Sequence, residues 1–217
     1  MIARHRQTYG EEVANVLTHG AGMLLGLTAI VVLMMAAIRS GNPWAIGSFA
    51  VYAVCMTLSY VTSTFYHAST HARQKRLLRR FDHSAIYLHI AGTYTPFTLV
   101  ALRQEGYWGW SLFAIVWIAA VVGVWLSFRK MKKKDHLKTV CYLAMGWVVI
   151  IAFKPLLHVF RENGSMDVLY WLIGGGLFYT VGSLFFFLDK YKYMHPVWHF
   201  FVLGGSVCHF ISIYLLV

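Results

Sequence analysis

The stretch "HPVWHFFVLGGSVCHFISIYLLV", residues 195–217, decides the fold class of this protein. It has no side chain with a fixed charge at neutral pH, and it is long enough for a single bilayer crossing, which takes about 20 helical residues. It also contains three histidines, His195, His199 and His209. Because an imidazole without a partner is costly in hydrocarbon, such residues are rare in membrane helices and indicate a functional site.

The composition of the whole chain also indicates an integral membrane protein. Of its 217 residues, 59% are hydrophobic and only 12% are charged, which leaves too little polar sequence to cover a soluble domain. The formal net charge is +11, but the 19 Lys and Arg residues stand in short clusters between apolar runs. This pattern is typical of membrane topology and argues against nucleic acid as a partner.

Seven apolar runs are long enough to cross a membrane. Each exceeds the length of a strand and lacks strict alternation, which favours helices. The predicted helices cover residues 16–38, 45–67, 83–102, 107–128, 139–160, 167–188 and 195–217. No long linker interrupts the chain, so residues 1–217 are expected to form one domain. The predicted fold class is an all-α integral membrane protein, a seven-transmembrane helix bundle.

The positive charges predict how this bundle is oriented. Fifteen of the 19 Lys and Arg residues fall on one side, within residues 4–6, 73–80, 129–138 and 190–192. The opposite side has only Arg39, Arg103 and Arg161. Since cytoplasmic loops carry the excess of positive charge, the N-terminus is expected in the cytoplasm and the C-terminus outside.

This orientation brings distant polar residues to one depth. His67 ends the second predicted helix, Asp82 stands at the start of the third, and His195 and His199 begin the seventh. All four therefore lie at the cytoplasmic end of the predicted bundle. His195 and His199 are four residues apart, so both rings project from one helical face, a spacing at which two imidazoles bind one metal ion.

His67 would add a third ligand to this pair. Three histidines with an open fourth position resemble a catalytic zinc site, where the remaining place holds a water molecule. Asp82 could orient that water or take its proton, and Ser63, one turn before His67, could bond a ligand or a developing oxyanion. Two simpler roles stay open: Asp82 as the N-cap of its helix, and the Ser63 hydroxyl bonded back to its own helix.

The remaining histidines of the apolar runs fit this set less well. His209 is about 15 Å along the helix from His199 at 1.5 Å per residue, so a packing role is expected. His71 is a reserve ligand at the edge of the basic loop. His89 lies deeper in the helix, too far to bind the ion directly, so only a role in a pathway to the site stays open for it. His19 is expected to pack in the helix, or to contact a metal ligand from behind.

Several motifs together resemble the hemolysin III proteins, bacterial members of the progestin and adipoQ receptor (PAQR) superfamily, distantly related to the alkaline ceramidases. The resemblance rests on Ser63-x3-His67 and on four quoted segments: "GEEVANVLTHGAG" (10–22), "FDHSAIYLHIAGTYTPF" (81–97), "CYLAMGW" (141–147) and "HPVWHFFVLGGSVCHF" (195–210). It implies a multi-pass protein of the bacterial inner (plasma) membrane with seven helices. It further implies zinc held by His67, His195 and His199, with Asp82 and Ser63 near the water.

The function expected from these observations is a zinc-dependent hydrolase of lipid amide or ester bonds that acts in membrane lipid homeostasis. Membrane lipids are its expected partners, and a lipid is its expected substrate. Two alternatives belong to other classes: a non-catalytic membrane sensor or regulator with structural zinc, and a hemolytic, membrane-lytic protein. Asp82 separates the first alternative from the hydrolase, because a structural zinc site has no need of a nearby base.

Overall fold

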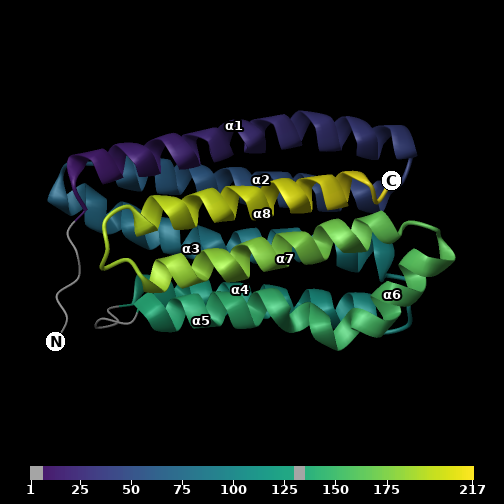
Figure 1. Ribbon diagram of the computed structural model, residues 1–217. Coiled ribbons are helices and arrows are strands. Elements are labelled where there is room, and N and C mark those ends of the chain that lie inside the picture. Colours follow the sequence, from purple (N-terminus) through teal and green to yellow (C-terminus); the bar gives the residue numbers. More distant parts are fainter. Residues whose placement is uncertain (1–6, 130–134) are drawn as a thin grey trace.

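The structure is a computed structural model that describes residues 7–129 and 135–217, and every regular element in these ranges is helical (Figure 1). The elements are α1 (Tyr9–Ser40), α2 (Pro43–Ala68), α3 (Ala72–Pro96), the π-helical turn η1 (Phe97–Ala101), α4 (Trp108–Phe128), α5 (Asp135–Gly146), the 3₁₀ segment η2 (Trp147–Ala152), α6 (Phe153–Glu162), α7 (Met166–Phe187) and α8 (Met194–Tyr214). The long helices run side by side along one direction and form an elongated bundle.

Six helical segments of the described ranges are long and apolar enough to cross a membrane: α1, α2, α4, residues 137–162, α7 and α8. The prediction of an all-helical membrane protein is confirmed at this level, whereas the seven crossings and the orientation stay predictions. α3 is not among the six, since residues 73–80 are rich in Arg and Lys and its second half holds His, Tyr and Thr. Residues 91–98 are nevertheless all buried, because α3 packs against α2, α4 and α5.

The ends of α1 and α2 follow from local sequence. Thr8 caps α1 and forms a reciprocal capping box with Glu11, which satisfies backbone N–H groups that a helix start leaves without partners. Gly41 ends α1 in the left-handed conformation at φ 67°, a backbone region that glycine enters without strain. Asn42 then caps α2, and Pro43 occupies its first position, where proline loses no helical hydrogen bond.

Three predicted helices differ from those observed. The helix expected over residues 16–38 begins earlier, at Tyr9, and ends at Ser40. The helix expected from residue 83 begins at Ala72, and His71 is its N-cap residue. The alternative role of Asp82 as an N-cap is therefore wrong, because Asp82 lies three turns inside the basic first half of α3. The run 139–160 is divided among α5, η2 and α6, and Tyr94 of α3 supports this break: its hydroxyl donates to Gly146 O at 2.6 Å and accepts from Val149 N at 2.9 Å.

Close contacts between helices rest on small residues and buried tyrosines. Gly22 of α1 faces the ring of Tyr60 in α2 so closely that a Cβ atom at Gly22 would lie 2.2 Å from ring carbons. The Tyr60 hydroxyl donates to Ser206 Oγ in α8 at 2.7 Å, and the Tyr179 hydroxyl of α7 lies 2.8 Å from the same atom. Ser206 thus ties three helices together inside the bundle, where hydroxyl groups need protein partners.

Candidate metal centre

Three histidines from two helices meet at one end of the bundle. His67 lies in the last turn of α2, and His195 and His199 lie in the first two turns of α8. The end of α2 and the beginnings of α1, α3 and α8 share this end of the molecule (left in Figure 1). The predicted convergence of these three histidines is therefore found in the structure.

The three rings are close enough to hold one metal ion. One nitrogen from each ring can be chosen so that all three lie within 4.8 Å of one another. The ring centroids are 4.6 Å apart for His195 and His199, 5.0 Å for His67 and His199, and 5.3 Å for His67 and His195. Three nitrogens bound to one ion at about 2.1 Å in tetrahedral geometry are about 3.4 Å apart. Small side-chain rotations would therefore bring all three nitrogens to binding distance of one ion.

The atoms that face the centre have the chemistry of metal ligands. His67 Nε2 and His199 Nε2 are buried and have no hydrogen-bond partner among the described residues. His195 Nδ1 is also buried, although the residue as a whole is partly accessible. Buried imidazole nitrogens normally have a partner, and a divalent ion would satisfy several of them at once. The donor set of these residues therefore fits a metal ion.

The nitrogens on the far side of two rings contact α1. His67 Nδ1 lies 2.7 Å from Glu12 Oε2, and Lys75 Nζ lies 2.6 Å from Glu12 Oε1. His199 Nδ1 lies 3.4 Å from Thr18 Oγ1. Metal-binding histidines commonly donate their second N–H to such an oxygen.

Sequence reasoning missed both Glu12 and Thr18. The available signal was a polar spacing of three and four residues in an otherwise apolar helix, at positions 11, 12, 15, 18 and 19. These positions lie on neighbouring turns of one side of the helix. The pattern marks a polar face at the start of α1, but it does not say which histidines that face meets.

Asp82 and Ser63 lie beside the histidine cluster. The Ser63 side chain hydrogen-bonds the Asp82 carboxylate, and Asp82 is close enough to His67 for an electrostatic interaction. Ser63 is buried, so its hydroxyl needs a partner inside the protein. α2 and α3 thus place a hydroxyl and a carboxylate next to a candidate ligand.

The other histidines weighed from the sequence lie outside the ligand set, and His19 contacts one of the candidate ligands. His71 is exposed at the start of α3. His209 contacts Leu172 O at 3.2 Å and so packs between α8 and α7. His89 is buried deeper in the bundle, near the rings of Tyr52 and Tyr60. His19 stacks on His199 with ring centroids 3.5 Å apart, so it holds a candidate ligand from behind.

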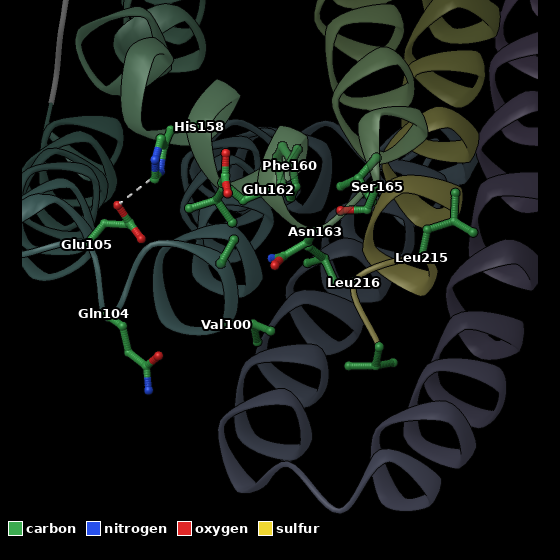
Figure 2. A pocket seen from close by; sticks show the side chains of 14 residues that line it. Val100, Gln104, Glu105, His158, Phe160, Glu162, Asn163, Ser165, Leu215 and Leu216 are labelled. Atoms are coloured by element: carbon green, nitrogen blue, oxygen red, sulfur yellow. Dashed lines mark ion pairs between the residues drawn. The ribbon is translucent and has the colours of Figure 1, made fainter.

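A pocket of about 440 Å³ lies at the opposite end of the bundle and does not belong to this centre (Figure 2). Its wall includes Glu105 and His158, whose Oε2 and Nδ1 atoms are 3.8 Å apart, and Glu162 lies nearby. The His158 side chain is 67% exposed, unlike the buried rings of the metal centre. None of the residues predicted for the site lines this pocket.

The fold and the site together define an integral membrane protein built from helices, with a buried three-histidine cluster at one end. A sequence model of the family described as haemolysin-III related matches residues 7–210. The chain is 41% identical over 212 residues to Hemolysin-3 of Bacillus cereus, which covers 98% of this chain and 94% of that protein. It is 42% identical over 206 residues to the Hemolysin-3 homolog of Bacillus subtilis (strain 168), with 95% and 94% covered.

The chain belongs to the hemolysin III family of the PAQR superfamily, and it is a multi-pass bacterial membrane protein. Both statements confirm the expectations from the sequence. The distant relationship to alkaline ceramidases stays a prediction.

Proposed function

We propose that this protein is a zinc-dependent hydrolase that cleaves amide or ester bonds of membrane lipids near the cytoplasmic face. The observation that carries the proposal is the cluster of His67, His195 and His199, close enough to hold one ion, with the carboxylate of Asp82 beside it. Catalytic zinc is typically held by three protein ligands with a fourth position open, and three neutral histidines are one such set.

The bound ion would supply Lewis acidity and an activated water molecule. Asp82 would be the base in this reaction: its carboxylate would take a proton from the attacking water molecule. Asp82 would then return that proton to the nitrogen or oxygen of the leaving group, so that a fatty acid and an amine or alcohol would be released. Ser63 holds the carboxylate in place through its hydrogen bond.

The place of the cluster supports a lipid substrate. We propose that all seven long helical segments cross the membrane, with the N-terminus inside, because 15 of the 19 Lys and Arg residues then face the cytoplasm. His67, His195 and His199 would lie at the inner ends of α2 and α8, near the level of the lipid headgroups. Amide and ester bonds of lipids lie at this level, and the basic loops attract anionic headgroups.

Turnover of a defined lipid tests the proposal. The purified protein is reconstituted into vesicles that contain a fluorescent ceramide or a fluorescent ester lipid, and release of the fatty acid is followed. Loss of a general base typically lowers the rate by about 10²- to 10⁴-fold, so Asp82→Asn should reduce kcat/KM by this factor. His67→Ala should abolish turnover, while His71→Ala, an exposed histidine from the same end, should leave it unchanged. Equal turnover by wild type and Asp82→Asn would overturn the proposal.

The alternative of a sensor with structural zinc makes an opposite prediction for the same variant. A sensor would bind zinc without turnover of any tested lipid, and Asp82→Asn would keep both the metal and the effect of the protein on cells. Zinc content and a cellular phenotype of Asp82→Asn, measured together, therefore separate these two classes.

The names of the two relatives, Hemolysin-3 and Hemolysin-3 homolog, favour membrane lysis as a further candidate. Lysis would release dye from liposomes in the absence of any hydrolysed lipid. Dye release that is equal for wild type and Asp82→Asn would support this candidate over the hydrolase.

A further inference from the structure

We propose that α1 sets the tautomers of two histidines in the metal centre. Glu12 and Thr18 accept the Nδ1 protons of His67 and His199, and both rings then present an Nε2 lone pair toward the ion. Glu12 and Thr18 are therefore positioning residues. The inference rests on the proposed metal site, and it concerns residues that lie outside the ligand set.

Glu12 determines the tautomer of His67. An ionised carboxylate can only accept hydrogen bonds, so at 2.7 Å from Glu12 Oε2 the Nδ1 atom of His67 must carry the proton. In a neutral ring Nε2 then has a free lone pair. Nε2 is the buried atom of His67 that has no partner among the described residues, so the lone pair points into the histidine cluster.

Asn15 also approaches the same atom of His67, at 3.2 Å from Nδ2 to Nδ1. An amide NH₂ group can only donate, so it would require the other tautomer. The contact with Glu12 is shorter by 0.5 Å and involves a charged group, which makes it the stronger bond. The Asn15 NH₂ group instead donates to Gln7 Oε1 at 2.6 Å.

Lys75 holds the carboxylate in this position. Its Nζ donates to Glu12 Oε1 at 2.6 Å, on the opposite oxygen from His67. Glu12 thereby links α1 to the end of α2 and the start of α3. The carboxylate has little freedom to turn away from the ring, so the ligand is oriented before any ion binds.

Thr18 acts on His199 by the same principle. A hydroxyl has a single proton, and the Thr18 proton goes to the backbone of α1, where Oγ1 lies 2.9 Å from Ala14 O and 3.0 Å from Asn15 O. Oγ1 is left to accept from His199 Nδ1 at 3.4 Å. The backbone of Asn15 also hydrogen-bonds the His199 ring, and a carbonyl oxygen can only accept, so both contacts from α1 favour the Nδ1–H form. The stacked ring of His19 limits rotation of His199, so its Nε2 atom also faces the cluster.

Removing a support of this kind typically lowers metal affinity by about 10- to 100-fold. The test is a titration of the metal-free full-length protein in mild detergent with Zn²⁺ against a competing chelator. Glu12→Ala should raise the Kd by this factor. Glu12→Gln should raise it less, because its side-chain oxygen can still accept from Nδ1. Glu11→Gln is the matched control: Glu11 is the adjacent carboxylate and bonds Thr8 and the Tyr193 N–H.

A second readout follows the tautomers directly. In ¹⁵N-histidine-labelled, metal-free protein, NMR should show the proton of His67 and of His199 on Nδ1. Glu12→Ala should shift His67 toward the Nε2–H form. Thr18→Val, which removes the hydroxyl with little change of shape, should shift His199 in the same direction by a smaller amount, because the backbone of Asn15 still accepts from its ring. If either ring is in the Nε2–H form in the wild type, or if Glu12→Ala and Glu11→Gln raise the Kd equally, the inference is wrong.

The two readouts also separate this inference from the proposed function. A wild-type protein that binds no Zn²⁺ would refute the proposed metal site, whereas the tautomers of the metal-free protein would still decide the roles of Glu12 and Thr18. A variant that fails to fold is recognised by its elution profile. In that case the NMR spectra of the wild type and of Thr18→Val decide whether the inference holds.

Discussion

Substitution of Gly22 by alanine tests the contact between α1 and α2 on which the metal centre depends. The new Cβ atom would lie 2.2 Å from Cδ1 and Cε1 of Tyr60 and 2.7 Å from Cγ. Tyr60 is almost fully buried, and its hydroxyl donates to Ser206 in α8. The ring therefore cannot turn away without losing a buried hydrogen bond, and α1 must move instead.

The expected magnitude combines two opposing effects. Forcing an extra carbon into a packed interior destabilises a protein by about 1–3 kcal/mol, and the simultaneous clash with two ring carbons favours the upper half of this range. Alanine is favoured over glycine inside a helix by about 1 kcal/mol. Gly22→Ala should therefore lower the free energy of unfolding by about 1–2 kcal/mol.

The assay is unfolding in mild detergent, by heat and by titration with a denaturing detergent. Gly20→Ala is the control, because a Cβ atom at Gly20 meets nothing within 4 Å; it should be as stable as the wild type or more stable. Metal affinity should also fall in Gly22→Ala, since the Tyr60 ring lies edge-on to His19, which stacks on His199. If Gly22→Ala and Gly20→Ala are equally stable, the described packing of α1 on α2 is wrong.

Two further predictions concern the metal. Protein purified in mild detergent without added metal should contain about one zinc ion per chain by mass spectrometry, and His195→Ala/His199→Ala should contain none; zinc in the double variant would place the ion elsewhere. Removal of the ion by a chelator should lower the unfolding temperature. Zinc added back at 100 times its Kd should raise the free energy of unfolding by about 2.7 kcal/mol. If neither treatment changes the stability, the folded state binds no ion.

The fold class was predictable because a single physical requirement dominates it. A chain in a bilayer must satisfy its backbone hydrogen bonds internally, so apolar runs of sufficient length become helices. The runs at 107–128 and 167–188 lie within one or two residues of α4 and α7. α3 was harder to predict, because its basic first half continues the helix beyond the apolar run.

Part of the site was predictable for a related reason. The ends of successive helices alternate between the two ends of the bundle, so residues near those ends can be assigned to one depth. This reasoning brought His67, Asp82, His195 and His199 together, as the structure does. It could not show that Ser63 bonds Asp82, because that contact depends on how α2 and α3 are rotated.

A helical membrane protein with histidines gathered at one end could be inferred from the sequence alone, since length, hydropathy and helical spacing are properties of the local chain. Which atoms face the metal centre, and which residues support them, depends on how the helices pack in three dimensions. Glu12 meets His67 and Lys75, and Thr18 meets His199 across more than half of the chain. Such contacts depend on the rotation and approach of whole helices, which are set by packing between residues such as Gly22 and Tyr60.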